Sequence, residues 1–200
     1  MKKVIFIGSH GTGKSTLAKH MEEEIRKANP GMDVRIIDHL SEEAKKKGYK
    51  LNIFESQTYA IKAQLVLLRS YLRALGTNKD ADVLLIPDNM VRQYVYSEYN
   101  GMYEEFLDLL RDFMNKEIRN SLILYIPIEF ALPWDRHPSE SFHKAIDNSM
   151  IDILDKARED GNLCYTIKGA EMERVKIAME AYNEFCKSSS SSSKSRSIRR

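Results

Sequence analysis

Short apolar runs alternate along the chain with longer segments in which apolar residues recur at helical spacing. The runs are rich in β-branched, aliphatic and aromatic residues, which is typical of strands buried on both faces. They predict strands near 3–8, 33–38, 81–88, 121–128 and 163–169. The amphipathic and charged segments predict helices near 14–28, 41–49, 55–75, 102–118, 141–160 and 171–186. Because strands that alternate with helices form parallel sheets, we predict an α/β fold with a five-stranded parallel sheet and helices on both faces.

The segment between the first strand and the first helix reads GSHGTGKS, from Gly8 to Ser15. It matches G-x-x-x-x-G-K-[ST], the P-loop, in the strand-to-helix context that the motif requires. Its glycines let backbone N–H groups converge on a phosphate, Lys14 contacts the β and γ phosphates, and the hydroxyl of Ser15 is a Mg²⁺ ligand. The residues predicted to bind ATP are Gly8, Ser9, His10, Gly11, Thr12, Gly13, Lys14, Ser15 and Thr16. The alternative is an ordinary glycine-rich turn between a strand and a helix.

Composition suits a single domain without a membrane segment. The 200 residues are 42% hydrophobic, and no apolar run is long enough for a signal peptide or a membrane span. Cys164 and Cys186 form no disulfide framework or metal-binding pattern, which favours reduced thiols and a cytoplasmic location.

The C-terminal segment differs in composition from the rest of the chain. It reads KSSSSSSKSRSIRR and holds five basic residues, no acidic residue and one apolar residue. Such a segment cannot form a packed core, so we expect residues 1–186 to form the P-loop domain and residues 187–200 to be a disordered tail. The tail is interpreted as a solvated terminus or as an electrostatic arm that binds DNA.

Two acidic residues stand at the ends of predicted strands, at the edge where ligands of parallel α/β sheets bind. Asp88 ends the predicted third strand, where its carboxylate would bind Mg²⁺ directly or through water, or cap the segment that follows. Asp38 ends the second strand beside the P-loop. It is a candidate catalytic base that takes a proton from an acceptor hydroxyl, and its alternative role is again a helix cap.

Two arginines are candidates for phosphate contacts. Arg136 lies in PWDRHPSE, where two prolines stiffen a loop, and would contact the γ-phosphate or form a surface ion pair. Arg92 would contact an acceptor phosphate, or pair with Glu98 or Glu104. The tyrosines around Arg92 are candidates to stack on an acceptor base or are core residues, namely Tyr94, Tyr96, Tyr99 and Tyr103.

Other classes of P-loop protein fit the sequence less well. A GTPase needs D-x-x-G, which the chain lacks, and N-K-x-D, where TNKDAD has Ala81 in place of the final aspartate. A motor or an AAA-type ATPase normally needs a longer chain. A compact chain with a helical region between its strands fits a small-molecule kinase better.

Over most of residues 3–180 the chain resembles the P-loop kinases related to nicotinamide riboside kinase and, more distantly, thymidylate kinase. Beyond the P-loop, the stretches that carry the resemblance are IIDHLSEEAKKKGY, ESQTYAIKAQLVLLRSYL, LYIPIEFALPWDRHPSESFHKAID and YTIKGAEMERVKIAMEAY. The resemblance implies that Gly169 and Arg174 help to form an adenine pocket and that Arg136 lies in a lid. One position departs from the family, which carries Asp-Arg or Glu-Arg after the third strand, because here Asn89 follows Asp88.

Together, the motif and the resemblance predict a kinase that uses ATP and Mg²⁺. It would transfer the γ-phosphate to a hydroxyl or phosphate of a nucleoside, a nucleotide or a modified base. A special case is 5-hydroxymethyluracil in phage DNA, which some related P-loop enzymes phosphorylate. The alternative is a P-loop NTPase that senses or hydrolyses nucleotide and acts through a protein partner.

Overall fold

The computed structural model describes residues 1–38, 40–49, 57–129 and 140–197. One sheet of five parallel strands has the order β2-β3-β1-β4-β5. The strands are β1 (Lys2–Ile7), β2 (Val34–Ile36), β3 (Val83–Ile86), β4 (Ser121–Tyr125) and β5 (Cys164–Thr166). The predicted parallel α/β fold is therefore confirmed, with strands shorter than predicted. Apolar residues just past the strand ends, such as Ile126 and Ile167, are still fully buried, which explains why the apolar runs are longer than the strands.

The central strand β1 divides its side chains between two apolar cores, one on each face of the sheet. Val4 and Phe6 belong to the core under α1 (Lys14–Ala28) and α7 (Glu171–Ser197). Ile5 and Ile7 belong to the core formed with the helices of the opposite face. Because neighbouring strands and both helical layers cover β1, these four side chains are at most 1% exposed.

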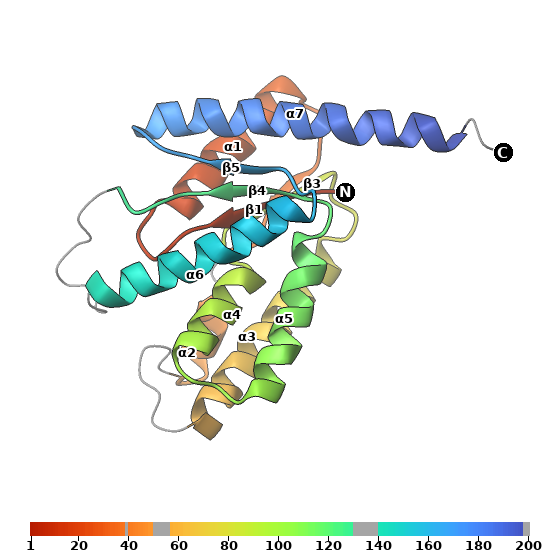
Figure 1. The fold of residues 1–200 in the computed structure, drawn as a ribbon. Helices are drawn as coiled ribbons and strands as arrows, with labels where there is room; N and C mark the ends of the chain where they lie inside the picture. The colour runs from red at the N-terminus through yellow and green to blue at the C-terminus, as the bar shows by residue number, and fades with distance from the viewer. Residues whose placement is uncertain (39, 50–56, 130–139, 198–200) are drawn as a thin grey trace.

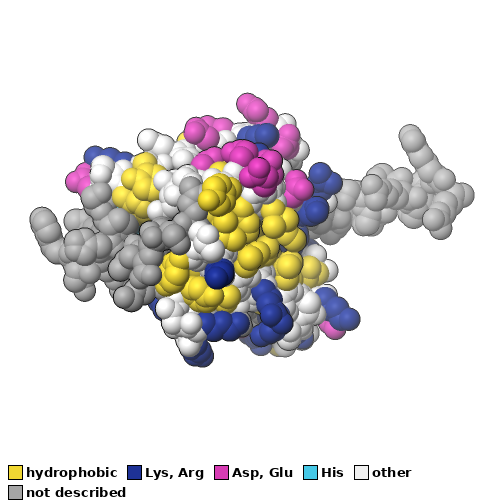
Figure 2. All heavy atoms as spheres, turned by 90° about the horizontal axis from the view of Figure 1, so that it is seen from below, with side chains coloured by type: hydrophobic (Ala, Val, Ile, Leu, Met, Phe, Trp, Pro, Cys, Tyr) yellow, Lys and Arg dark blue, Asp and Glu magenta, His cyan; other side chains and the backbone are white. Residues whose placement is uncertain are grey.

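The second helical layer lies on the other side of the sheet from α1 and α7 (Figure 1). Its elements are α2 (Leu40–Lys46), α3 (Gln57–Thr77), α4 (Met90–Tyr99), α5 (Glu104–Ile118) and α6 (Glu140–Glu159). Figure 2 shows this layer from below, where hydrophobic side chains gather between charged ones. Exposed leucines on α3 and α5 include Leu65, Leu72 and Leu109, so the layer is not uniformly polar.

The structure has a helix, α4, that the sequence patterns did not predict. Asn89 begins it, because its side-chain Oδ1 accepts a hydrogen bond of 3.1 Å from the backbone N–H of Arg92. A second cap comes from a distant element, since Glu117 of α5 accepts from the backbone N–H of Met90 at 2.8 Å. The contact to Glu117 depends on tertiary structure and could not be found in the local pattern.

Helix α7 continues without a break through the serine run to Ser197. From the sequence, the folded domain was expected to end at Cys186 and residues 187–200 to be disordered. Among the side chains of α7 that the structure describes, the last buried one is Phe185, so the residues beyond it lengthen the helix without adding to the core. None of the described helices combines the length and the apolar character needed to cross a bilayer.

Candidate active site

The P-loop connects the end of β1 to the start of α1, as the motif requires. Two glycines are essential to its course. A side chain at Gly8 would overlap the carbonyl oxygen of Ile126 and crowd the hydroxyl of Thr12. Gly13 has φ of 90° and begins α1 from the left-handed region, which disfavours any residue with a side chain. The loop therefore places backbone against backbone at the carboxyl edge of the central strand.

Lys14 folds back onto its own loop. Its ammonium group donates to the carbonyl oxygen of Gly8 at 2.7 Å and to that of Ser9 at 2.5 Å. Burial and the nearby charge of Arg92 lower the pKa of this amine to about 7, while Asp88 and Asp38 act in the opposite direction. The lysine is thus held at the loop, within the electrostatic influence of both carboxylates predicted at the strand ends.

Asp88 is buried, with 2% of its surface exposed, and both of its carboxylate oxygens have protein partners. Oδ1 accepts from Nη1 of Arg92 at 3.0 Å, and Oδ2 accepts from the backbone N–H of Leu40 at 2.9 Å. Nη2 of Arg92 lies 3.2 Å from Nε2 of His10, and its guanidinium carbon lies 5.6 Å from the ring centre of Tyr96. This network fixes the direction of Arg92 at the edge of the P-loop.

The partner of Arg92 differs from both partners considered in the sequence analysis. The carboxylate of Glu98 accepts instead from the hydroxyl of Tyr94 at 2.6 Å, and Glu104 pairs with Arg111 at 3.2 Å. The i, i+4 spacing of Asp88 and Arg92 spans the first turn of α4, which explains how the two meet.

Asn89, which departs from the family pattern, has a structural role. Its Nδ2 donates to the carbonyl oxygen of Phe6 at 2.8 Å and to that of Ile86 at 3.2 Å. The same side chain caps α4, so it joins β1 and β3 to the helix that carries Arg92. The carboxamide therefore has a structural role at the position where the resembled kinases carry an arginine, and Arg92 lies in the first turn of the same helix.

The predicted base, Asp38, and the predicted Mg²⁺ ligand Ser15 lie at the same edge. Asp38 follows β2 and raises the pKa of the Lys14 amine through its charge. Ser15 is the second residue of α1. Within residues 1–38, 40–49, 57–129 and 140–197, no three acidic, histidine or cysteine side chains converge as a metal site. Arg136 lies outside the residues that the structure describes.

On the other side of the P-loop, a cavity of about 340 Å³ separates the start of α1 from the start of α7. Gly11, Thr16, His20, Gly169 and Arg174 are among its lining residues. The resemblance had assigned Gly169 and Arg174 to an adenine pocket, and both lie beside the P-loop.

Arg174 joins the two walls of this cavity, and only 8% of it is exposed. Its Nη1 donates to the carbonyl oxygen of Thr12 at 2.8 Å, and its Nε donates to that of Gly169 at 2.8 Å. Its Nη2 forms an ion pair of 2.6 Å with Glu129, which also accepts from the backbone N–H of Gly169. Arg174 therefore braces the P-loop against the β5–α7 connection.

Two residues of α6 that the sequence analysis did not select also face this region. Nδ1 of His143 lies 2.7 Å from the hydroxyl oxygen of Ser9, and Asp147 accepts from the hydroxyl of Tyr125 at 2.7 Å. The charge of Asp147 also raises the pKa of the Lys14 amine. Their i, i+4 spacing in the predicted helix was the available signal, because it places both on one face.

One family model and several solved structures match this chain. The family described as AAA domain matches residues 3–174, which is most of the chain. No curated protein matches the sequence. An AAA-type ATPase was expected to need a longer chain, but chain length does not exclude this family, because its domain matches within 200 residues.

Solved structures share the fold at low sequence identity. A NadR protein in complex with NAD and AMP-PNP has a TM-score of 0.63 and 17% identity, over 92% of this chain and 49% of its own. A thymidylate kinase from Ehrlichia chaffeensis has a TM-score of 0.63 and 13% identity, over 89% and 97%. A deoxyadenosine kinase from M. mycoides with bound dATP has a TM-score of 0.56 and 16% identity, over 90% and 99%. The chain spans about half the length of the NadR chain, and the likeness confirms the kinase-like P-loop fold.

Proposed function

The chain belongs to the AAA domain family, and from this premise we propose that it is an ATP-dependent kinase acting on a nucleoside, a nucleotide or a modified base. The observation that carries the proposal is the arrangement around Lys14. The groups that gather at one end of the central strand are the P-loop lysine, the ion pair of buried Asp88 with partly buried Arg92, and Asp38. Phosphoryl transfer depends mainly on positioning and charge stabilisation, which these groups are suited to provide.

On the donor side, the loop amides and Lys14 would hold the phosphates of ATP. The positive end of the α1 dipole, which starts at Lys14, would add to this attraction. The cavity beside Arg174 and His20 would take the adenine base, since it opens from the same loop. Binding would draw the ammonium group of Lys14 from the loop carbonyls toward the phosphates.

On the metal side, the residues present fit Mg²⁺. The hydroxyl of Ser15 and the carboxylate of Asp88 are the oxygen donors that this ion prefers. Asp88 already accepts from Arg92 and Leu40, so its contact to the ion would run through water or compete with Arg92. When bound, the ion would neutralise charge on the transferred phosphate.

On the acceptor side, Asp38 is proposed as the base that receives the proton of an acceptor hydroxyl. Arg92 is proposed to contact an acceptor phosphate, because Asp88 and the ring of Tyr96 already hold its guanidinium in one direction. Arg136 is proposed as the contact to the γ-phosphate. The neighbours named as kinases of thymidylate and deoxyadenosine support a nucleoside or nucleotide acceptor.

A second candidate function is ATP hydrolysis or sensing coupled to a protein partner. The match to the AAA domain family favours it, since this description does not specify phosphoryl transfer to a small molecule. The same donor site would serve both functions. They differ in whether water or a bound acceptor receives the phosphate.

The test is a screen of labelled γ-phosphate transfer from ATP to nucleosides, nucleotides and modified DNA, with release of free phosphate measured in parallel. Transfer to an acceptor supports the kinase, whereas phosphate release that no acceptor changes supports the NTPase. Lys14→Ala should abolish either activity while the protein stays folded, because Lys14 stabilises transition-state charge. Lys19→Ala is the control, since Lys19 is exposed on the same helix. Full activity of a folded Lys14→Ala protein would refute the donor site.

A further inference from the structure

A buried hydrogen bond ties α6 directly to the P-loop. Nδ1 of His143 and the hydroxyl oxygen of Ser9 lie 2.7 Å apart, although 134 positions separate them in the sequence. His143 is 3% exposed and Ser9 is 0% exposed. Burial lowers the pKa of His143, which favours the neutral imidazole. The contact is therefore a hydrogen bond between two neutral groups shielded from water.

Ser9 is also one of the two residues whose carbonyl oxygens hold Lys14. Its carbonyl oxygen accepts from the ammonium group of Lys14 at 2.5 Å and from the hydroxyl of Thr12 at 3.0 Å. A rotation of the Ser9 backbone would move this carbonyl and both of its donors. The hydrogen bond to His143 opposes such a rotation, because it anchors the hydroxyl group of Ser9 to α6.

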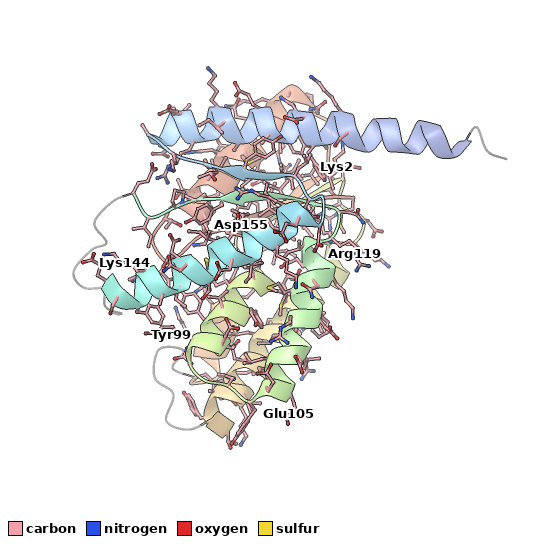
Figure 3. All side chains as sticks on the ribbon, in the orientation of Figure 1. Lys2, Tyr99, Glu105, Arg119, Lys144 and Asp155 are labelled. Carbon is pink, nitrogen blue, oxygen red and sulfur yellow. The ribbon has the colours of Figure 1, made fainter. Side chains whose placement is uncertain are left out.

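Helix α6 is itself held against α4, so the anchor is rigid. The ring of Phe142 packs edge-on against Tyr96 and Tyr99 of α4, with ring centres 5.6 and 4.7 Å apart. Figure 3 shows α6, marked by Lys144, above α4, whose end is marked by Tyr99. One turn beyond His143, Asp147 accepts from Tyr125 at the end of β4. The P-loop, the sheet and the helix of Arg92 therefore meet at this part of α6.

We propose that His143 is a positioning residue for phosphoryl transfer: through Ser9 it fixes the carbonyl that orients Lys14. This inference rests on the proposed function and identifies a residue of the same site that does not touch the reacting atoms. The alternative is a core histidine that only stabilises packing. The two differ in what is lost when the bond to Ser9 is removed from a folded protein.

The experiment is a double-mutant cycle on kcat, measured with ATP and the acceptor found by the transfer screen. Ser9→Ala deletes one oxygen, and His143→Phe removes the imidazole while keeping a ring. Each should lower kcat by about two- to tenfold, the range expected for one lost hydrogen bond. The double variant should be no slower than the slower single variant, because both changes remove the same bond.

Conservative variants at position 143 separate positioning from packing. His143→Asn should recover most of the rate, because its amide reaches the place of Nδ1. His143→Gln should not, because its amide instead reaches the place of Nε2, for which the structure shows no hydrogen-bond partner within its described residues. Ser121→Ala is the control, since it deletes an equally buried hydroxyl at the opposite end of the sheet. It should change the melting temperature without changing kcat.

The outcomes distinguish this inference from the proposed function. If the wild-type protein transfers phosphate and the four variants of Ser9 and His143 keep its kcat, His143 is a packing residue and the inference is wrong. Rate losses that simply multiply in the double variant would also overturn it. If the wild-type protein binds no ATP and transfers no phosphate, the proposed function fails before any variant is compared.

Discussion

Replacing Glu117 with glutamine should remove a large pH dependence from the stability of the fold. Glu117 lies near the end of α5, with 4% of its surface exposed. Its carboxylate accepts from the hydroxyl of Tyr71 at 2.5 Å and from the first backbone N–H of α4, at Met90. Burial raises the pKa of this carboxyl to about 7, although those hydrogen bonds and Lys3 act to lower it and Asp88 adds to the rise.

The sign and size of the effect follow from this raised pKa. Between the ordinary value of 4.5 and about 7, the folded protein keeps a proton that the unfolded chain releases. The contribution of Glu117 to stability is therefore complete below pH 4.5 and is lost as the pH rises through about 7. At 1.36 kcal/mol for each pH unit, the loss amounts to about 3 kcal/mol.

The assay is urea unfolding of the wild-type protein and Glu117→Gln from pH 4.5 to about pH 8, with the difference in free energy of unfolding plotted against pH. Because glutamine stays neutral, the variant should gain about 3 kcal/mol relative to the wild type across this range. Glu105→Gln is the control, on the exposed side of the same helix (Figure 3), and should follow the wild-type curve. A difference for Glu117→Gln that does not change with pH would refute the reasoning.

Three further predictions concern the site. Asp38→Asn should lower kcat by about 10²- to 10⁴-fold with little change in ATP affinity, because asparagine cannot accept the proton. If ATP affinity, measured by titration, falls as much as kcat, Asp38 is not the base. Gly8→Ala should lower the free energy of unfolding by about 1–3 kcal/mol, because the new methyl group meets the Ile126 carbonyl. Its control is Gly76→Ala in α3, where the space is open, which should raise the free energy of unfolding by about 0.5–1 kcal/mol in the same thermal unfolding experiment. Arg174→Lys should weaken ATP binding about tenfold, measured by calorimetry, because lysine cannot make the three contacts of the guanidinium group. An unchanged ATP affinity would mean that the adenine of ATP binds elsewhere.

The chain's local patterns were sufficient for the fold class and for the P-loop. Apolar runs that are buried on both sides can be recognised from composition alone, because residues covered on both faces of a sheet are apolar, as in residues 4–7 of β1. The P-loop is equally local, since its glycines, lysine and serine act through one continuous backbone segment. The positions of Asp38 and Asp88 followed from parallel topology, which brings strand ends to one edge.

Contacts between distant segments were decided only by the tertiary structure. Glu98 and Glu104 were the partners considered for Arg92 from the sequence, but the structure pairs it with Asp88. Glu98 instead accepts from Tyr94, and Glu104 pairs with Arg111, which sequence spacing alone does not reveal.

The bond between Ser9 and His143 likewise joins a loop and a helix that meet only when α6 packs beside the sheet. A sequence pattern records which faces are apolar, and so it determines layers and strand ends. It does not record which polar groups meet across those layers, because that depends on the packing of side chains far apart in the chain.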